Sequence, residues 1–274
     1  MGSRPNVVGA LPREALRELI ERGEGGDRAF VDALLRMDWA RAPSPAERAQ
    51  LRELHVALQA AALRSHADVR QQIAQGALQG DALRRLFDDV PLLERDHFVE
   101  EVLGIAYPPL DEPPLTTSEQ MTYAPSGYDE IVHAFDVSQL GAGARFLDLG
   151  SGLGKAVMLA ALLTGAESSG VELDGELCNL GRAAATALGL TRVQLRAGDA
   201  REVSSADADV VFMYLPFAGE ALAQVMQRLL EDGRCSRPQP RPRFLCTGPL
   251  DVARYPQLAA VGAAKSWLNV YRFR

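Results

Sequence analysis

The sequence predicts an α/β fold in which a doubly wound, mostly parallel sheet follows an N-terminal all-helical domain. Three observations support this prediction: helical spacing of apolar residues in the first hundred positions, four prolines in the segment 107–114 (YPPLDEPP), and short β-like runs that alternate with helical patterns after Thr122. Alternating strands and helices form right-handed βαβ units and hence a parallel sheet. We expect a helical domain over 1–106, a proline-rich linker over 107–122 and a sheet domain over 123–274.

The first domain is predicted to contain consecutive helices. Its apolar stripes indicate helices near 16–20, at 27–37, from 44 to about 61, at 81–87 and at 92–103. Ser44-Pro45-Ala46-Glu47 is a capping box with proline in the first turn, which marks the start of the third helix. Gly104 marks the end of the last one. Stripes of this kind pack against each other in a small bundle.

The second domain is predicted to contain five parallel strands and an antiparallel last strand. The strand-like runs are 145–149, 168–172, 193–197, 209–214 and 243–247, and a terminal hairpin has 267–273 as its second strand. In a doubly wound sheet, ligands bind at the carboxyl ends of the strands. We therefore expect the functional residues at those ends.

Composition excludes several classes of function. The net charge of −7 and the pI near 5.2 argue against a nucleic-acid partner, and the basic stretch 234–243 is interpreted as an exposed loop. The three cysteines lack CxxC spacing and the four histidines are scattered, so we expect no metal site and no disulfide framework. We find no membrane-spanning run and no signal peptide, and expect a cytoplasmic setting.

A glycine-rich turn follows the first predicted strand. Gly150, Gly152 and Gly154 alternate between that strand and a helix, and glycine lets the backbone turn sharply and approach a ligand closely. A dinucleotide fingerprint would need glycine at position 155, where this chain has Lys155. A phosphate-binding P-loop would need Ser or Thr at position 156, where it has Ala156. The turn alone could also bind nothing.

Acidic residues lie at three successive strand ends. Asp148 precedes the first glycine, and its carboxylate suits a ligand with an ammonium group better than a pyrophosphate. Glu172 ends the second strand, where an acid can accept both ribose hydroxyl protons, as it also does in dinucleotide enzymes. Asp199 follows the third strand, where it can accept a hydrogen bond from an adenine amino group. After the fourth strand, Tyr214-Leu215-Pro216-Phe217 can border a reacting group or simply pack the strand end.

These motifs, in this order, resemble the S-adenosylmethionine motifs of class I methyltransferases. The resemblance covers roughly 123–274 and implies a Rossmann-like sheet. The segment 122–128 (TYAPSGY) further resembles the lead-in of Dot1-like protein lysine methyltransferases, and more closely that of the enzymes that modify the c-subunit of ATP synthase. The asparagine of the Dot1 turn and the membrane anchor of the second group are missing from this chain.

The resemblance implies a role for each motif. The residues implied to bind S-adenosylmethionine are Asp148, Gly150, Ser151, Gly152 and Gly154 at the methionine moiety, Glu172 at the ribose, Asp199 at the adenine, and Leu173, Ala200, Tyr123, Tyr128 and Tyr214 elsewhere around the cofactor. The residues implied to border the reacting methyl group are Tyr123, Tyr214, Pro216 and Phe217.

The resemblance also implies the reaction. Methyl transfer is an in-line displacement that depends on alignment in a dry pocket. The turn 214–217 has no side-chain amide or carboxylate, which argues against an adenine or glutamine acceptor. We expect N-methylation of a protein lysine, with Glu119, Tyr123 or Glu220 as candidates to orient the amine. The alternatives are methylation of a small metabolite or natural product under a helical lid, and a non-catalytic cofactor-binding module. The oligomeric state stays open.

Overall fold

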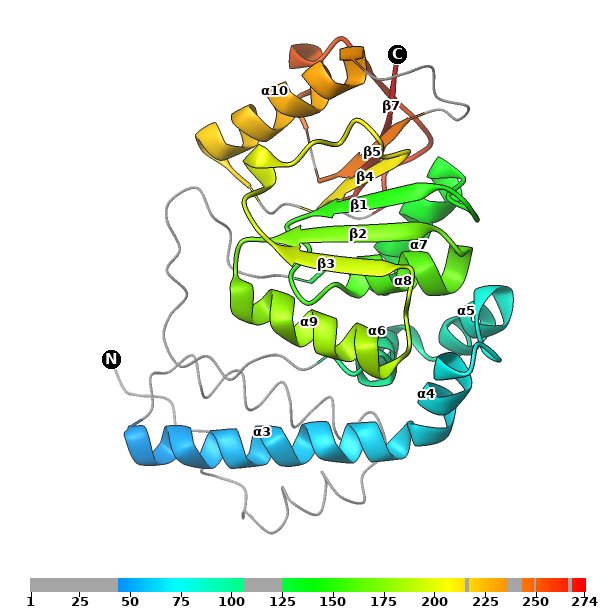
Figure 1. Cartoon of the computed structure of the whole chain (residues 1–274), viewed down its shortest axis with the longest axis vertical. Helices are drawn as coiled ribbons and strands as arrows, with labels where there is room; N and C mark the ends of the chain where they lie inside the picture. Colours follow the sequence, from blue (N-terminus) through cyan, green and yellow to red (C-terminus); the bar gives the residue numbers. More distant parts are fainter. Residues whose placement is uncertain (1–43, 106–124, 215–216, 236–242, 249, 266–267) are drawn as a thin grey trace.

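The computed structural model describes residues 44–105, 125–214, 217–235, 243–248, 250–265 and 268–274. In this part of the chain, seven strands form one sheet in the order β3-β2-β1-β4-β5-β7-β6 (Figure 1). Strands β1 to β5 are parallel, and β7 runs antiparallel to both β5 and β6. The strands are β1 (Arg145–Leu149), β2 (Glu167–Glu172), β3 (Val193–Ala197), β4 (Val210–Met213), β5 (Phe244–Thr247), β6 (Leu258–Ala260) and β7 (Asn269–Phe273). The predicted doubly wound, mostly parallel sheet with an antiparallel last strand is confirmed.

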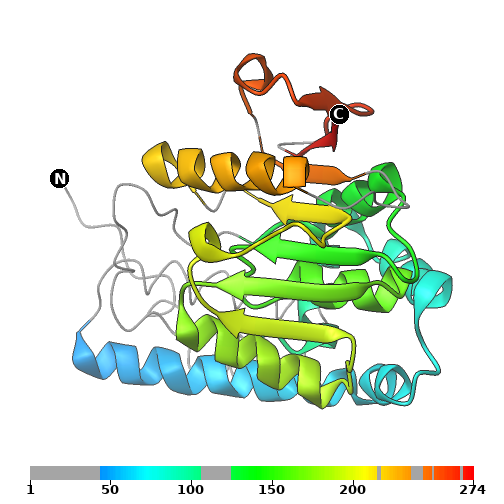
Figure 2. The same cartoon turned by 45° about the horizontal axis from the view of Figure 1, so that its top comes forward.

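Helices surround this sheet and extend beyond one of its edges. They are α3 (Pro45–Ser65), α4 (Ala67–Ala74), α5 (Gly80–Asp88), α6 (Leu92–Leu103), α7 (Tyr128–Ser138), α8 (Lys155–Thr164), α9 (Gly175–Ala187) and α10 (Gly219–Cys235), with short 3₁₀ turns η2 (Ala200–Glu202) and η3 (Val252–Arg254). The long helix α3 runs along the lower edge of the molecule in Figures 1 and 2. The helices predicted near 16–20 and at 27–37, and the linker 107–122, lie outside the described residues.

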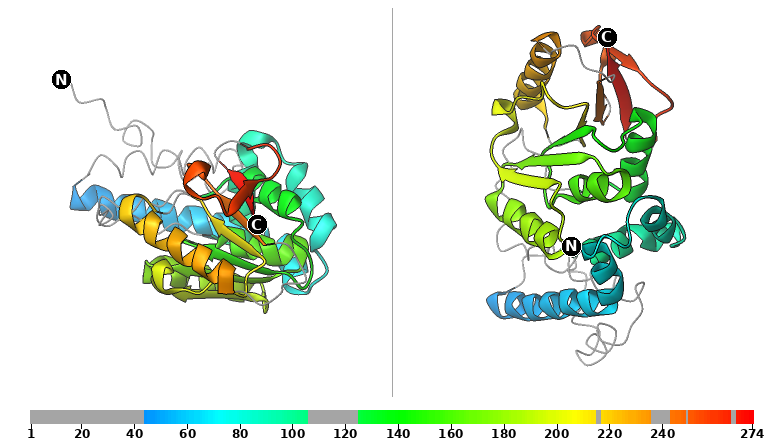
Figure 3. Two further views of the ribbon diagram at one scale, coloured as in Figure 1. Left: turned by 90° about the horizontal axis from the view of Figure 1, so that it is seen from above. Right: turned by 45° about the vertical axis from the view of Figure 1, so that its right-hand side comes forward.

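Each face of the sheet has its own hydrophobic core. Successive side chains of a strand point to opposite faces, so Phe146 joins the cluster with α7, α8 and α9, while Leu147 joins the cluster with α10. Figure 3 shows α7 and α10 on opposite sides of the sheet. Because both faces are covered, the central strand β4 is buried along its whole length and reads as a continuous apolar run.

The N-terminal helices share the core of the first face. Leu83 and Phe87 of α5 and Val99 of α6 belong to the same cluster as Val157 of α8, and all four are fully buried. Helix α3 packs against α6, and α5 and α6 pack against α8. The N-terminal helices α3 to α6 therefore form an additional layer, the helical layer, which packs on the helices that cover the sheet. The predicted domain boundaries stay a prediction, since the linker between the two regions is not described.

Two helices were not predicted from the sequence. Helix α4 buries only Ile73, so it shows almost no apolar stripe. Helix α7 begins with Tyr128, at the end of the segment predicted to fold over a cofactor, and it buries one face against the sheet. Tertiary contacts therefore define α4, whereas the buried residues of α7, such as Tyr128, Ile131 and Phe135, recur at helical spacing.

Two glycines of α9 provide a matched test of this packing. A Cβ on Gly181 would lie 2.6 Å from the backbone oxygen of Leu153, whereas a Cβ on Gly175 would meet nothing within 4 Å. We expect Gly181→Ala to lower the free energy of unfolding by about 1–3 kcal/mol, although alanine has the higher helix propensity. Gly175→Ala should be close to neutral. Urea denaturation of both variants measures the difference; equal stabilities would show that α9 does not press on the glycine turn.

Candidate active site at the carboxyl ends of the strands

The glycine turn after β1 has a backbone that only glycine adopts readily. Gly150, Gly152 and Gly154 have φ angles of 83°, 53° and 78°, in the left-handed region that penalises a Cβ. The N–H groups of Gly150 and Ser151 donate to the backbone oxygen of Val171, at 2.8 and 3.0 Å. The turn is thereby fixed to the end of β2, where the sequence predicted a second part of the site.

The carboxylate of Glu172 completes this attachment. Its Oε2 accepts the N–H of Gly152 at 2.7 Å, and its Oε1 accepts the N–H of Asp174 at 2.9 Å. Each oxygen keeps a further lone pair for a ligand hydroxyl. Because N–H groups of the turn are already engaged within the chain, the turn is a poor cradle for a pyrophosphate. This agrees with the missing fingerprint glycine at Lys155.

Asp148 is a buried carboxylate at the end of β1. Its side chain is 4% exposed, and no hydrogen bond reaches it from the part of the chain that the structure describes. Burial, and then the nearby charge of Glu172, raise the pKa of Asp148 well above the ordinary carboxyl value. A buried polar group without a partner is costly, and such groups mark sites where a ligand supplies the partner. An ammonium group fits this position.

The side chain of Ser151 points from the turn toward β2. A Cβ on Gly170 of β2 would lie 2.7 Å from Ser151 Oγ, so the hydroxyl fills the space that this glycine leaves open. The Oγ atom is buried and has no hydrogen-bond partner. The sequence predicted a cofactor contact for Ser151; its side chain faces β2, and the predicted contact stays a prediction.

Three further residues predicted to bind the cofactor, Leu173, Asp199 and Ala200, lie just after β2 and β3. Leu173 is an exposed apolar side chain, 55% accessible, which offers a surface for a flat ring. Asp199 caps η2 and holds Arg201 through a side-chain pair, with an Nη2–Oδ2 distance of 2.5 Å. This hydrogen bond lowers the pKa of Asp199. Ala200 is buried. An adenine amino group at Asp199 would have to share the carboxylate with Arg201, so these adenine contacts stay predictions.

Tyr214 follows β4, as predicted, and its ring stacks on Phe212 at a centroid distance of 6.5 Å. Burial raises the pKa of Tyr214, and the charges of Glu130 and Asp96 raise it further. Two carboxylates, from α7 and α6, therefore act on this phenol. Phe217 is half-buried against the second core, while Leu215, Pro216 and Tyr123 lie outside the described residues.

Tyr128 lies within the helical layer. Its ring packs edge-to-face on Phe87 at 5.6 Å, and its hydroxyl donates to Asp88 Oδ1 at 3.0 Å. Its backbone N–H donates to Asp96 Oδ1 at 2.7 Å. Burial, and then Asp88, raise the pKa of the phenol. The ring thus fixes the start of α7 to α5, and the predicted contact of Tyr128 with a cofactor stays a prediction.

Four charged residues near the site were given no role in the sequence analysis: Asp96, Glu100, Glu130 and Lys155. Lys155 is 5% exposed, and its Nζ donates to Asp96 Oδ1 at 2.6 Å and to Glu100 Oε1 at 3.0 Å. Glu130 is half-buried and has neither a hydrogen bond nor an ion pair with the residues around it that the structure describes. In the sequence, Asp96 and Glu130 look like ordinary solvated charges of amphipathic helices. Only the packing of α6 and α7 against α8 gives them a role.

The other candidates to orient an amine are less well placed. Glu220, in the first turn of α10, is exposed and accepts a hydrogen bond from Gln224 at 3.1 Å. Glu119 and Tyr123 lie outside the described residues. Within those residues, no group of three or more His, Cys, Asp or Glu side chains could hold a metal ion. None of the described helices is both long and apolar enough to cross a lipid bilayer.

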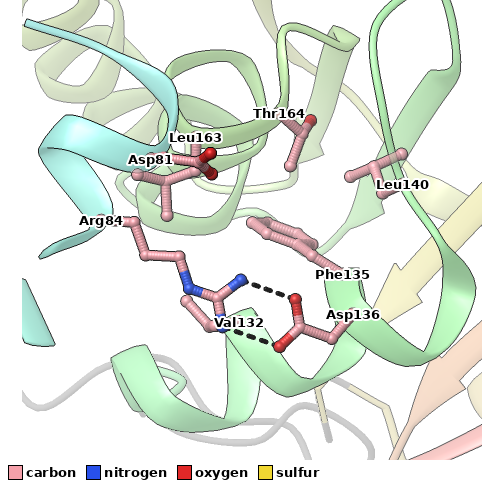
Figure 4. Close-up of a pocket in the computed structure, with 8 residues that line it drawn as sticks. All are labelled: Asp81, Arg84, Val132, Phe135, Asp136, Leu140, Leu163 and Thr164. Carbon is pink, nitrogen blue, oxygen red and sulfur yellow. Dashed lines mark hydrogen bonds and ion pairs between the residues drawn. The ribbon is translucent and has the colours of Figure 1, made fainter.

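A hollow elsewhere in the molecule is not the predicted site. Figure 4 shows it between α5, α7 and the C-terminal end of α8, with a volume of about 270 Å³. Arg84 and Asp136 form a two-pronged ion pair across it, at 2.6 and 2.7 Å. Thr164 lines the hollow at the end of α8, whereas the glycine turn leads into the first residue of that helix, Lys155.

Comparison with known proteins finds a family match for the middle of the chain. Residues 116–195 match the family described as "Histone methylation protein DOT1". This segment includes the glycine turn and Glu172. Among curated proteins, no relative matches the chain. The match confirms the predicted resemblance to Dot1-like class I methyltransferases, and with it the prediction that the chain is an S-adenosylmethionine-dependent methyltransferase.

Solved structures similar to this chain include several methyltransferases. An RNA methyltransferase from Salinibacter ruber, in complex with S-adenosyl-L-homocysteine, is 24% identical over 55% of this chain and 92% of its own, with a TM-score of 0.46. A SAM-dependent methyltransferase from Thiobacillus denitrificans, in complex with the same compound, is 24% identical over 47% of this chain and 50% of its own, with a TM-score of 0.37. Another from Aquifex aeolicus is 13% identical over 52% of this chain and 88% of its own, with a TM-score of 0.40.

The raised pKa of Asp148 predicts a pH-dependent cost in stability. The folded chain binds this proton more tightly than the unfolded chain, so stability falls as pH rises from the ordinary carboxyl pKa through the raised value. Asp148→Asn removes the titration. We expect the melting temperature of the variant, without cofactor, to exceed that of the wild type by a margin that grows over this pH range.

The control for this measurement is Asp207→Asn, which changes a carboxylate that is 90% exposed. It should show no such widening margin. If Asp148→Asn and the wild type keep a constant difference at every pH, the carboxylate is not held in the costly environment described above.

Proposed function

We propose that this methyltransferase binds S-adenosylmethionine over the glycine turn and methylates the side-chain amine of a lysine in a protein. The observation that carries the proposal is the buried carboxylate of Asp148, which lacks a partner beside a turn fixed for close approach. An ammonium-bearing ligand satisfies this carboxylate, whereas a phosphate ligand would be repelled by it.

The residues present fit this cofactor. Asp148 would hold its ammonium group, and the left-handed glycines let its methionine part approach the backbone. Glu172, with both oxygens oriented by backbone N–H groups, would accept the ribose hydroxyls. Leu173 and Asp199 would border the adenine. When bound, S-adenosylmethionine supplies a methyl group on a positively charged sulfur.

The surroundings of Tyr214 favour a cationic acceptor. Glu130 has no partner in the described structure, and its charge reaches the phenol of Tyr214. A carboxylate in this position would attract a lysine ammonium and accept a hydrogen bond from it. Tyr214 would shield the amine from water. Deprotonation of a lysine at neutral pH costs about 4–5 kcal/mol, and burial next to a cationic cofactor lowers that cost.

The family match supports a protein acceptor. The matched family is described by histone methylation, and the match includes the turn and β2. The net charge of −7 suits a basic protein substrate better than a nucleic acid. A lysine ammonium would gain both a hydrogen bond and charge attraction from the carboxylate of Glu130, whereas an uncharged amide or base amine would gain only the hydrogen bond.

The cofactor assignment is tested by removing Glu172. We expect Glu172→Ala to weaken S-adenosylmethionine binding by at least about 1 kcal/mol, roughly fivefold in Kd, because a charge-assisted hydrogen bond is lost. Glu176→Ala removes an exposed acid from the nearby first turn of α9 and should leave the Kd unchanged. Titration calorimetry measures both; equal affinities for the two variants would remove Glu172 from the site.

The acceptor is identified by incubating the chain with methyl-labelled S-adenosylmethionine and a size-fractionated cell extract. We expect label in the macromolecular fraction that is sensitive to protease and recovered as methyl-lysine. The variant Glu130→Gln should transfer much less label at equal cofactor saturation, because it loses the charge that attracts the ammonium. Glu167→Gln, at the opposite end of β2, should transfer label as the wild type does.

Other distributions of the label would contradict the protein-lysine proposal. Label in the small-molecule fraction would indicate a metabolite acceptor under the helical layer. Label that is released by nuclease would indicate a nucleic acid. If wild-type protein binds the cofactor but no fraction becomes labelled, the chain is a cofactor-binding module.

A further inference from the structure

A lysine directly follows the glycine turn that is proposed to bind a cationic cofactor. Lys155 is the first residue of α8 and directly follows Gly154 of the turn. A helix N-terminus already carries a partial positive charge, and the ammonium of Lys155 adds a full one. S-adenosylmethionine brings a further positive charge on its sulfur. Binding of this cofactor therefore requires negative charge that offsets the ammonium of Lys155, and this charge must come from outside the turn.

Helix α6 supplies this compensation. Asp96 and Glu100 lie one turn apart on α6, and both accept hydrogen bonds from the Lys155 ammonium, at 2.6 and 3.0 Å. The side chains of Lys155 and Glu100 are only 5% and 13% exposed, so water screens this pair weakly, whereas the carboxylate of Asp96 is half exposed. The formal charges of these three side chains, one ammonium and two carboxylates, sum to −1.

The cluster directly follows the glycine turn and is joined to the start of α7. Asp96 Oδ1 accepts the N–H of Tyr128 as well as the ammonium of Lys155, which fixes the carboxylate between α7 and α8. The charge of Asp96 also raises the pKa of Tyr214, the residue predicted to border the methyl group. The Lys155 ammonium thus lies beside a carboxylate whose field reaches that position.

We propose that Asp96 and Glu100 are positioning residues that neutralise Lys155 and so set the preference of the site for cationic S-adenosylmethionine over its neutral product, S-adenosylhomocysteine. The inference rests on the proposed cofactor. It makes the helical layer part of the cofactor site, although α6 lies outside the matched segment 116–195. A purely structural clamp between α6 and α8 would instead affect both ligands equally.

A series of charge variants separates these roles. Lys155→Met, the wild type, Asp96→Asn and Asp96→Asn/Glu100→Gln give the cluster net charges of −2, −1, 0 and +1 in that order. Asn at position 96 can still accept the N–H of Tyr128, so the series changes charge with little change in shape. Binding of S-adenosylmethionine and of S-adenosylhomocysteine is measured for each by titration calorimetry at low ionic strength.

The ratio of the two affinities should fall along the series. We expect the preference for S-adenosylmethionine to decrease about threefold or more for each added positive charge. Asp96→Asn/Lys155→Met restores the net charge of −1 and should restore the wild-type ratio. Asp136→Asn, which breaks the distant ion pair with Arg84, should leave the ratio unchanged.

Two results would overturn the inference. If both affinities change together in every variant, the cluster is only a structural clamp. If Asp96→Asn/Lys155→Met does not recover the ratio, the charge of Lys155 is not what the carboxylates oppose. Failure of the wild type to bind either ligand would instead remove the proposed cofactor itself. Should Lys155→Met fail to fold, as judged by circular dichroism, the two carboxylate variants still decide the question.

Discussion

The site is organised by a buried carboxylate that has no partner in the described chain. Asp148 is the penultimate residue of β1 and points, like Phe146, to the face covered by α7 to α9. The turn that follows β1 bends back over β2 through three left-handed glycines. That turn is fixed by Val171 and Glu172, so the two acids are held near each other, and the charge of Glu172 adds to the burial that raises the pKa of Asp148. A positively charged ligand at Asp148 offsets both effects.

The parallel sheet explains why this arrangement can form. Strands β1 to β4 end at the same edge of the sheet. The helices on its first face pack on the strands through a hydrophobic core. The carboxyl ends are then free to present polar groups. The helical layer adds charges from a different part of the chain, since Asp96 and Glu100 reach the start of α8 and oppose Lys155. Electrostatics at the turn therefore depends on packing outside the sheet.

The strands and the cofactor motifs could be predicted from the sequence, because each depends on residues that are neighbours in the chain. The run around Phe146 identified β1, and the order of Asp148, the glycines and Glu172 identified the class of enzyme. The partners of Lys155 could not be predicted: Asp96 lies 59 positions away, and no local pattern links the two. The ring of Tyr128 likewise lies in the helical layer because of Phe87 and Asp88, which belong to a different helix.

Proton release on ligand binding tests the central claim most directly. Below its raised pKa, Asp148 is protonated in the free chain, and a ligand ammonium should drive the proton off. Calorimetry of S-adenosylhomocysteine binding in buffers of different ionisation enthalpy counts that proton. We expect release by the wild type that is absent in Asp148→Asn. The same proton count in both would show that the ligand's ammonium does not meet Asp148.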